Sequence, residues 1–564
     1  MKKLLLSAFG VVILGALANA QVIFNVKTPA NLAGNYPLTV ATGGWGTPDM
    51  NIAANAVENQ LVFVGPDTLA CTDPENGAAL AGKIAVLYRG SCEFGAKALR
   101  AQTAGAIAVV IINNSGAPVA MGAGAQGANV TIPTIMISTS DGALLRDEII
   151  AGNVTAFIGT KVGLFANDLG YKEPFAVYPG IASIPITMTK QAGQYEVAPG
   201  IWVYNFGNQP QTGSVRASIT RSGGTVVYNE SQGNLTLNPG DSIFASFPVY
   251  SPAWTQDFEY TLSYEITSGG GADGFPDDNN KNAIFTINNT THSAVPIDFA
   301  TGLPVANTFI RSGNAAPNRY CAYMRDTTGS QQRLKGFSFA LTPNTGLELT
   351  NEFIEIEMYE WNDVFTDIND ATFTDLNPIA FAEYSYTENL ANVSVYAPTS
   401  DNIVLQKGQR YLACLKQLTD NYFIGFNNGR DYNATIDRYL EPVSIVESGG
   451  TFFSAGFGTN TTFAMGIHTE PLNVGINDNT STLVSGAAYP VPAAKVINIP
   501  LGAKKEVSNV IVFDQLGRKT IETTGTMAGN LLEVNVEGLA DGQYTFNVIF
   551  SDNTSNTFKV IIRK

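Results

Sequence analysis

Histidine is the scarcest of the residues that could do chemistry in this chain, and its scarcity limits the reactions available. The only two histidines are His292 and His468, which stand far apart in the sequence. No His-Glu-x-x-His stretch occurs, which excludes a zinc peptidase of the zincin type. A Ser-His-Asp triad would have to recruit one of these two residues. Their contexts differ, and we expect both to be surface or packing residues.

A row of carboxylates could instead serve a glycosidase, which works with two acidic side chains. Its members are Glu355, Glu357, Glu360 and Asp363. Glu355 and Glu357 would share one strand face, about 7 Å apart, and Tyr359 and Trp361 could stack on a sugar ring. We favour a solvated strand face and core packing for these residues, because the sequence offers no cleft around them.

Two loops contain further candidates. The stretch Gly240-Asp241-Ser242-Ile243 has the letters of a GDSL hydrolase, but it lacks that family's α/β context, so we expect Asp241 to form a turn. The densest group of oxygen ligands comprises Asp273, Asp277, Asp278, Asn280 and Asn282. Its glycine and proline neighbours could wrap these oxygens around Ca²⁺, although the spacing is not that of an EF-hand. The alternative is a solvated loop with side-chain turns. We expect no other cofactor.

Composition indicates several β-rich modules. A chain of 564 residues is too long for one core, and its 55 glycines and scarce long helical patterns favour all-β modules with many turns. The net charge of −16 makes nucleic acid an improbable partner, since phosphate backbones would be repelled. The fold class predicted is therefore multidomain and mainly β.

The N-terminus has the pattern of a secretory signal peptide. A basic start precedes an apolar stretch, and Ala18-Asn19-Ala20 supplies a small-x-small cleavage site. We expect residues 1–20 to be removed between Ala20 and Gln21. No later segment is apolar and long enough to cross a membrane.

Residues 83–114 predict a parallel β-α-β unit. Residues 84–88 and 106–112 are short apolar runs, and between them Phe94, Ala98, Ala101 and Gly105 recur at helical spacing. A strand that is apolar on both faces is typical of a parallel sheet covered on both sides. We therefore expect an α/β domain at this end of the chain.

This region resembles the protease-associated (PA) domain over residues 21–165. The matching stretches are Arg89-Gly90-Ser91-Cys92-Glu93-Phe94, Ala104-Gly105-Ala106, Asn113-Asn114, Ile132-Pro133-Thr134-Ile135 and Asp141-Gly142. PA domains are usually non-catalytic modules that bind peptides, cap a protease or hold domains together. The resemblance implies a peptide groove lined by backbone, with Arg89, Asn113, Asn114 and Ser138 at its loops.

The four cysteines suggest one or two disulfides. Cys71 lies where PA domains of secreted proteins often place a second cysteine, so the resemblance implies a Cys71–Cys92 bridge, stabilising by about 3 kcal/mol. A Cys321–Cys414 pair is possible on count alone and is left open, because nothing local sets its geometry. No Cys-x-x-Cys or Cys/His cluster supports a zinc site of the usual kind.

Beyond residue 165 the sequence predicts a chain of β-sandwiches. Residues 166–195 carry Pro174, Pro179 and Pro185 and are interpreted as a linker. Residues 196–290 predict an Ig-like sandwich, and residues 291–470 a jelly-roll-like sandwich. With Val203-Tyr-Asn-Phe-Gly207, the turn Leu237-Asn-Pro-Gly-Asp241 and the closing Asp277-Asp-Asn-Asn-Lys-Asn282, the first of these resembles the CARDB type. We expect these central 300 residues to form layered sheets without a pocket where acid, base and nucleophile could meet.

The last 90 residues, 475–564, carry a set of motif residues: Tyr489, Pro490, Gly517, Arg518, Gly542, Tyr544 and Lys564. With them this stretch resembles the type A C-terminal sorting domain of the type IX secretion system of Bacteroidetes, a small Ig-like sandwich. Val491 stands where that family usually has Asn. The resemblance implies export through the periplasm and across the outer membrane by the type IX machinery, then release or surface attachment.

The predicted function is that of a secreted or surface-attached, non-catalytic protein that binds proteins or peptides through its PA-like module. The partner could be a protein, a peptide or a glycan. Two alternatives remain: a secreted hydrolase, either peptidase or glycosidase, and an adhesin that binds carbohydrate through residues 301–469. A peptidase domain would need more helices than residues 166–470 predict.

Overall fold

A computed structural model describes residues 22–325, 332–366, 368–472, 488–501, 506–551 and 555–564. The expected signal peptide, with its cleavage site at Ala20 and Gln21, lies outside the described residues. The chain divides into two compact units, Met1–Glu470 and Pro471–Lys564. Each unit is mainly β, so the prediction of a multidomain, mainly β fold is confirmed.

The N-terminal domain is built on a mixed sheet with the strand order β2-β1-β8-β4-β5-β6-β7-β3. Strands β4 to β7 are parallel neighbours, as predicted for the β-α-β unit. The strands are β1 (Val22–Thr28), β2 (Gly34–Tyr36), β3 (Leu38–Val40), β4 (Val57–Phe63), β5 (Ile84–Tyr88), β6 (Ala108–Ile112), β7 (Thr134–Ile137) and β8 (Thr155–Thr160); the helices are α1 (Gly77–Leu80), α2 (Phe94–Thr103) and α3 (Thr139–Ile150).

Helices α2 and α3 cover opposite faces of this sheet. Ile84, Val86 and Val110 share a buried cluster with residues of α3, whereas the alternate positions Ala85 and Val109 share one with residues of α2. Alternate side chains of a strand point to opposite faces, so each strand is buried on both sides. This explains the continuous apolar runs that the sequence shows there.

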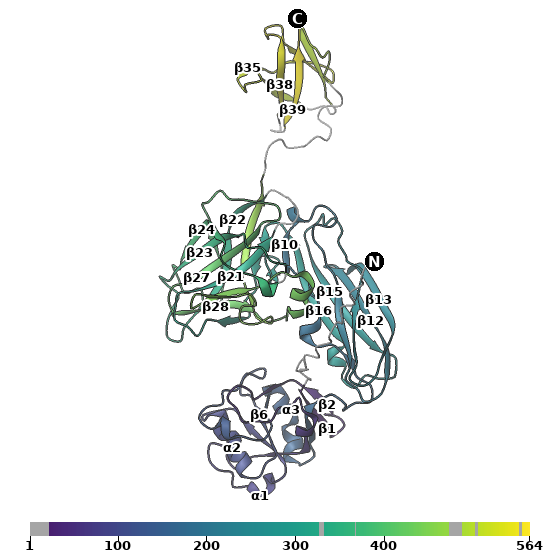
Figure 1. Cartoon of the computed structure of the whole chain (residues 1–564), viewed down its shortest axis with the longest axis vertical. Helices are drawn as coiled ribbons and strands as arrows, with labels where there is room; N and C mark the ends of the chain where they lie inside the picture. The colour runs from purple at the N-terminus through teal and green to yellow at the C-terminus, as the bar shows by residue number, and fades with distance from the viewer. Residues whose placement is uncertain (1–21, 326–331, 367, 473–487, 502–505, 552–554) are drawn as a thin grey trace, which may run out of the picture. The chain divides into compact units, whose positions relative to one another are not determined.

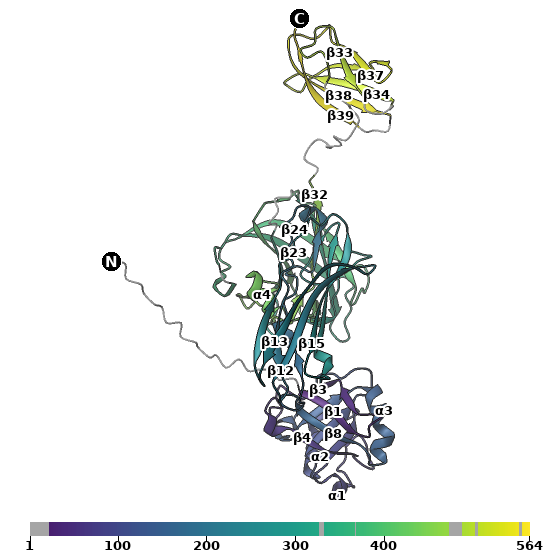
Figure 2. The same ribbon diagram turned by 90° about the vertical axis from the view of Figure 1, so that its right-hand side faces the viewer.

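The second module is a sandwich of a five-stranded sheet, in the order β10-β16-β15-β12-β13, and a three-stranded sheet, β14-β11-β9. Figure 2 shows β12, β13 and β15 next to one another. The strands are β9 (Leu169–Gly170), β10 (Ser183–Pro185), β11 (Gly200–Asn205), β12 (Gln211–Arg221), β13 (Thr225–Leu237), β14 (Ser242–Ser246), β15 (Phe258–Ser268) and β16 (Asn280–Asn288).

The expected linker at residues 166–195 is instead part of this sandwich. Strand β9 pairs with β11, and β10 pairs in parallel with β16. Tyr178, Ile184 and Met188 are buried in the sandwich core. Prolines are tolerated at the ends and edges of strands, so proline content alone did not distinguish this edge from a linker.

The third module has a large sheet with the central order β17-β32-β22-β28-β20 and a second sheet in the order β24-β23-β27-β21-β29-β30. The strands of the first sheet are β17 (Thr291–His292), β20 (Thr308–Ile310), β22 (Gln332–Pro343), β25 (Ser394–Pro398), β26 (Val404–Leu405), β28 (Tyr422–Asn427), β31 (Thr462–Phe463) and β32 (Gly466–Pro471). The second sheet comprises β21 (Asn318–Arg325), β23 (Phe353–Trp361), β24 (Leu376–Ser385), β27 (Arg410–Gln417), β29 (Ile445–Ser448) and β30 (Thr451–Phe453), and β18 (Ile297–Asp298) pairs with β19 (Leu303–Pro304).

The second and third modules share one continuous hydrophobic core, so they are not independent domains. Helix α4 (Asn433–Tyr439) joins them: the hydroxyl of Thr435 accepts a hydrogen bond from the amide of Tyr178 at 2.8 Å. The Tyr432 hydroxyl donates to the carbonyl of Ala294 at 2.7 Å, and its ring meets that of Tyr178 edge-on. The walls of any cavity between these modules are therefore held by both.

The C-terminal unit is a small sandwich of two sheets, β33-β37-β36 and β35-β34-β38-β39, around its own buried core. Its strands are β33 (Val496–Pro500), β34 (Val507–Phe513), β35 (Lys519–Thr523), β36 (Thr526–Ala528), β37 (Leu531–Asn535), β38 (Gly542–Phe550) and β39 (Ser555–Ile562). Alternate positions of β38, such as Tyr544 and Phe546, face this core, which agrees with the alternating pattern in the sequence.

Both possible disulfides are present. Cys71 is bonded to Cys92, and Cys321 to Cys414. The second pair could not be decided from the sequence, but β21 and β27 pair in a register that places Cys321 directly opposite Cys414. In the described part of the chain, no helix is long and apolar enough to span a membrane.

Candidate functional site

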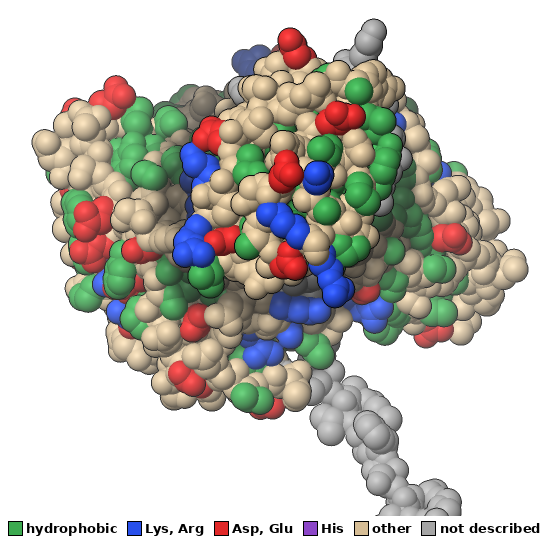
Figure 3. Space-filling view, turned by 90° about the horizontal axis from the view of Figure 1, so that it is seen from above, with side chains coloured by type: hydrophobic (Ala, Val, Ile, Leu, Met, Phe, Trp, Pro, Cys, Tyr) green, Lys and Arg blue, Asp and Glu red, His purple; other side chains and the backbone are tan. Residues whose placement is uncertain are grey.

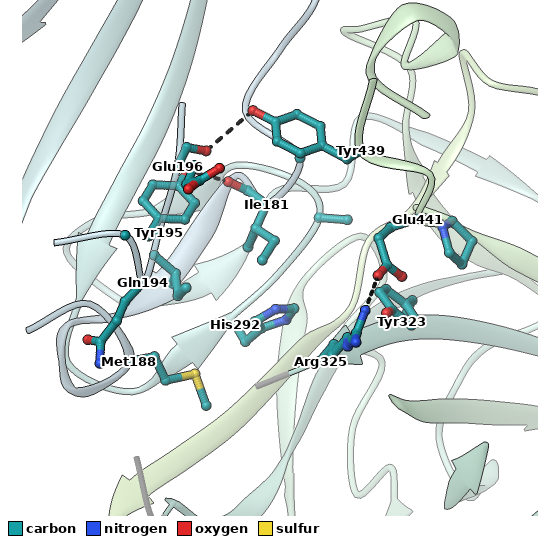
Figure 4. Close-up of a pocket in the computed structure, with 15 residues that line it drawn as sticks. Ile181, Met188, Gln194, Tyr195, Glu196, His292, Tyr323, Arg325, Tyr439 and Glu441 are labelled. Carbon is teal, nitrogen blue, oxygen red and sulfur yellow. Dashed lines mark hydrogen bonds and ion pairs between the residues drawn. The ribbon is translucent and has the colours of Figure 1, made fainter. Parts of the chain in front are cut away.

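A cavity of about 380 Å³ lies between the second and third modules. One wall is the segment from Gly180 to Glu196, and the opposite wall comes from β21 and the loop after α4. Figure 4 shows His292 between these walls, with Tyr195 and Tyr439 on one side of it and Tyr323, Arg325 and Glu441 on the other. The pocket therefore depends on residues that are more than a hundred positions apart.

His292 is the polar group that distinguishes this pocket. His292 is 2% exposed, and among the described residues neither of its ring nitrogens has a hydrogen-bond partner. Burial lowers the pKa of His292 to about 4, so the imidazole is neutral near pH 7. A neutral imidazole offers one donor and one acceptor. A buried polar group without partners costs free energy unless something pairs with it.

The opposite side of the pocket carries a charge pair. Arg325 donates from a guanidinium nitrogen to Oε1 of Glu441 at 2.8 Å. Tyr323 lies beside them, and burial together with the Glu441 charge raises the pKa of its hydroxyl well above the ordinary value. The formal charges of Arg325 and Glu441 cancel, so this wall is polar without a net charge.

The remaining lining is mostly apolar. Ile184, Met188 and Ala294 are buried and line the cavity. Two of the three tyrosines that line it have their hydroxyls engaged elsewhere: Tyr195 donates to the carbonyl of Ile181 at 2.7 Å, and Tyr439 accepts from the amide of Ala198 at 3.0 Å. The rings of Tyr195 and Tyr439 therefore add apolar surface to the pocket. The lining as a whole has few polar groups that could orient a ligand. Ligand sites commonly have this composition.

This pocket corrects the expectation that the central modules leave no place for ionisable groups to meet. The sequence analysis placed one wall in a linker and treated His292 as a surface or packing residue. A signal was nevertheless present, because Ile181, Ile184 and Met188 are apolar residues spaced through a segment that a true linker would keep polar.

The two histidines lie on paired strands, although they are far apart in the sequence. In the β17/β32 pair, Thr291 is opposite His468 and His292 is opposite Ile467. Nε2 of His468 lies 2.7 Å from the hydroxyl of Ser338, and Nδ1 lies 3.3 Å from that of Thr291. The third member is a threonine rather than a carboxylate, and Ser338 is fully buried. This cluster therefore lacks both the orienting charge and the access that a nucleophilic serine requires.

The carboxylates of β23 belong to an ion-pair network on the sheet. Glu357 pairs with Lys416 and accepts a hydrogen bond from Tyr359, and Arg319 lies 3.9 Å from it. Lys416 also lies 3.5 Å from Glu355. The expectation of a solvated strand face is therefore wrong for Glu357, because its side chain is buried. Glu360, further along the strand, accepts a hydrogen bond from the side chain of Asn377.

The aromatic residues of the same region pack inside the fold. The ring of Trp361 is buried and stacks on Phe373 with centroids 4.9 Å apart. Its indole nitrogen is 3.1 Å from Asp363, which also accepts hydrogen bonds from Thr374. Neither Trp361 nor Asp363 is placed to contact a sugar. Asp241 forms the predicted turn, accepting from the amide of Asn238.

The proposed calcium ligands have separate contacts in the fold. Asp278 is buried and pairs with the ammonium of Lys161 at 2.6 Å. Asp273 accepts from the amides of Leu169 and Phe275. Asp277 and Asn280 are exposed, and Asn282 lies in β16. Across the described residues, no group of three or more His, Cys, Asp or Glu side chains could hold a metal ion. Calcium binding by this loop stays a prediction, which a Ca²⁺ titration would test.

The four residues predicted in the N-terminal domain do come together at one edge of the sheet. Arg89 follows β5, Asn113 and Asn114 follow β6, and Ser138 follows β7, so all four lie at the carboxyl ends of parallel strands. Arg89 donates to Oδ1 of Asn113 at 3.1 Å, while Ser138 accepts from the amide of Asp141 at the start of α3. Asn114 alone is exposed.

Asn113 organises the exposed loop at this edge. Its side-chain amide donates to the carbonyls of Ser115 and Ala117 at 2.7 and 2.5 Å. The loop then runs through residues 114–126 without a charged side chain. The surface of this loop is therefore mainly backbone and uncharged side chains, and the peptide groove expected there stays a prediction.

The motif residues of the C-terminal unit hold its turns. Gly517 has φ of +76° in the turn where Arg518 pairs with Asp514 at 2.8 Å. The Tyr544 hydroxyl donates to the carbonyl of Ala540 at 3.1 Å. The other motif residues also lie at the ends of elements: Tyr489 bridges Asn498, Pro490 follows it, Gly542 opens β38, and Lys564 donates its amide to Asp541.

Acidic and basic side chains are interspersed with apolar and neutral ones on the face shown in Figure 3, and no histidine is seen there. This agrees with the burial of His292 and His468.

Comparison with known proteins identifies the two ends of the chain. The family described as "PA domain" matches residues 57–145, and the family described as "Secretion system C-terminal sorting domain" matches residues 487–563. Both resemblances seen in the sequence are therefore confirmed.

Curated relatives match over limited stretches. ER degradation-enhancing alpha-mannosidase-like protein 3 of Xenopus laevis is 35% identical over 20% of this chain and 14% of its own length. Probable leucine aminopeptidase 2 of Aspergillus fumigatus is 36% identical over 16% of this chain and 18% of its own length. Minor extracellular protease Vpr of Bacillus subtilis is 30% identical over 25% of this chain and 18% of its own length. The chain thus spans less than a fifth of the length of each relative.

Among solved structures, an aminopeptidase from Aneurinibacillus sp. strain AM-1 is similar at 26% identity, with a TM-score of 0.20, over 25% of this chain and 30% of that chain. The likeness to peptidases concerns the region of the PA domain. The chain is therefore a multidomain, mainly β protein that carries a PA domain and a type IX C-terminal sorting domain, and the sorting domain places it among secreted or cell-surface proteins.

Proposed function

We propose that this exported protein is a non-catalytic binding protein that takes protein or peptide ligands at the PA domain. The observation that carries the proposal is the uncharged loop of residues 114–126, held in place by Asn113 at the carboxyl edge of the parallel strands. Ligands of open α/β sheets bind outside this edge. A backbone-rich loop can hydrogen-bond an extended peptide without requiring a particular side chain.

The architecture around this loop supports a binding role. Arg89 and Ser138 are engaged in contacts that fix the edge, which leaves Asn114 and the loop backbone to meet a ligand. A preorganised loop loses less conformational entropy on binding than a free one. The sorting domain would bring the module to the cell surface through the type IX secretion machinery.

A peptide array probed with the mature chain tests this proposal, with Asn113→Ala as the key variant. Loss of its amide releases the loop, so peptide affinity should fall about tenfold or more. Asn129→Ala is the matched control, because Asn129 is exposed and its side-chain amide contacts only Gln126 among the described residues. Equal binding by both variants would refute a role for this edge.

The hydrolase alternative has its own test. Turnover of casein or of aryl glycosides by the purified wild-type chain, retained after further purification, would favour an enzyme over a binding protein. The glycan-binding alternative for residues 301–469 is less favoured, because Trp361 is 1% exposed and its ring is already stacked on Phe373. A glycan array with the mature chain would test it.

A further inference from the structure

The pocket between the two central modules has no part in the proposal above, and its chemistry indicates a ligand of its own. We propose that it binds a neutral aromatic ring that carries a hydrogen-bonding group at one end, as a phenol or an indole does, with that group paired to His292. The ring could belong to the side chain of a peptide or to a free small molecule.

The first argument is the unpaired imidazole. His292 is buried at the pocket wall, and within the described part of the chain both of its ring nitrogens lack partners. Its counterpart His468 has hydroxyl partners on both nitrogens. A ligand hydroxyl or N–H group would satisfy His292 in the same way, and it would gain the free energy that an unpaired buried group otherwise costs.

The second argument is the shape and polarity of the walls. A volume of about 380 Å³ is at the lower end of the range for ligand sites. Ile184, Met188 and Ala294 provide apolar surface, and the rings of Tyr195 and Tyr439 add aromatic surface. Aromatic rings pair well with such rings in tilted or edge-on contacts. A sugar fits less well, since hydroxyls all round its ring would lose water against apolar walls.

The third argument concerns charge. The imidazole is neutral, and the charges of Arg325 and Glu441 cancel in their ion pair. A charged ligand would therefore enter a low-polarity space without a free counter-charge, which is costly. Glu196 lines the pocket too, but its side chain is exposed to water. A neutral ligand is the class that the pocket accommodates best.

Calorimetric titration of the mature chain tests the proposal, with N-acetyl-tyrosinamide as the probe. We expect saturable binding, and binding about tenfold or more weaker for N-acetyl-phenylalaninamide, which lacks the hydroxyl. Methyl glucoside should not bind. Comparison with p-cresol and with the capped tripeptide Gly-Tyr-Gly distinguishes the sources: tighter binding of the tripeptide indicates a peptide ligand, and equal or tighter binding of p-cresol a free one.

Two variants locate the site. His292→Phe keeps a ring of similar shape but removes both nitrogens, so it should fold at least as stably as wild type and bind the tyrosine probe about tenfold or more weakly. Ala294→Leu should fill the pocket and abolish binding. Ile243→Phe is the control, since it adds a ring at an exposed position of β14.

The proposal is overturned if folded wild-type protein shows no saturable binding, if the phenylalanine probe binds as tightly as the tyrosine probe, or if methyl glucoside binds more tightly. It is also overturned if His292→Phe binds like wild type. The substitutions His292→Phe and Ala294→Leu leave the PA loop unchanged, so their failure to weaken binding would leave the peptide-binding proposal standing.

Discussion

Lys161 carries a buried charge just after the last strand of the PA domain, and its removal should destabilise the adjoining sandwich strongly. Its ammonium is fully buried, 2.8 Å from Asp168 and 2.6 Å from Asp278. The rings of Phe206 and Phe275 face it at 3.9 and 4.6 Å. The substitution Lys161→Met keeps the apolar stem but leaves two carboxylates without a counter-charge.

Breaking a buried ion pair by removing one partner costs about 3–5 kcal/mol, and we expect a loss of this size in the free energy of unfolding at pH 8. The loss should be about 1–2 kcal/mol smaller at pH 5, because the stranded carboxyls can then take up protons. Oδ2 of Asp168 and Oδ1 of Asp278 are buried and have no hydrogen-bond partner among the residues that the structure describes. Each of these oxygens is therefore free to take up a proton.

The wild-type chain should show a related pH dependence. Burial is the main cause that raises the pKa of Asp168 to about 6 and the pKa of Asp278 to about 7. The charge of Lys161 lowers both pKa values, and the nearby charge of Asp273 raises both. Between pH 4 and 7 the folded chain thus holds protons that the unfolded chain has released. The stabilisation that these bound protons give the folded state is fully present below about pH 4. It is lost as the pH rises through the folded-state pKa values of Asp168 and Asp278.

The size of this effect follows from the shifts. A rise from 3.8 to about 7 for Asp278 corresponds to ~4 kcal/mol at 1.36 kcal/mol per pKa unit. Because the two carboxyls share one ammonium and titrate as a pair, we expect about 2–4 kcal/mol in total. Asp278→Asn should flatten the dependence between pH 5 and 8, and should be neutral or stabilising at pH 8.

Urea unfolding followed by tryptophan fluorescence measures these changes, since Trp254 is buried in the sandwich core. Lys172→Met is the matched control: Lys172 is also buried and lies 4.3 Å from the ring of Tyr204, and none of the ion pairs found among the described residues involves it. Its loss should stay within about 1 kcal/mol. The reasoning is refuted if Lys161→Met costs no more than Lys172→Met, or costs the same at pH 5 and pH 8.

Three further predictions concern other parts of the chain. Replacing both Cys321 and Cys414 by Ala should lower the free energy of unfolding by about 2–5 kcal/mol, measured in urea, and a reducing agent should then have little further effect on this module. Trp361→Ala should cost about 3–5 kcal/mol by leaving a cavity; a loss near zero would indicate an exposed ring. Gly517→Ala should lower the stability of residues 471–564 by about 1 kcal/mol, because Gly517 has positive φ, whereas Gly538→Ala should be neutral, since φ is ordinary and a Cβ there meets nothing within 4 Å.

Local patterns were sufficient to predict the two ends of the chain. The apolar runs at 84–88 and 106–112 predicted parallel strands, and the structure has β5 and β6 there, each buried on both faces. The prediction succeeded because a short β-α-β unit forms contacts between segments close in sequence. The strand predicted at 353–361 is present as β23. Helix α4 was not anticipated, since a helix this short has little periodicity to detect.

Predictions that depended on isolated residues were less successful. Residues 166–195 were interpreted as a linker on their prolines, yet Ile184 and Met188 are core residues. Glu357 was expected on a solvated face, but Lys416 and Arg319, which lie on other strands of the same sheet, form ion pairs with it. In each case the residues that bury or pair with the side chain are distant in the sequence. Strand register determines which residues these are, and local patterns do not specify the register.

The sequence by itself determined the class of the protein: mainly β, exported, with a PA domain first and a sorting domain last. Those features reside in contiguous motifs whose turns, periodicity and cysteine positions are local. Only the tertiary structure decided how residues distant in the sequence are placed. It placed His292 in a cavity, Lys161 between two carboxylates and Cys321 opposite Cys414, because burial and pairing depend on which distant strands come together.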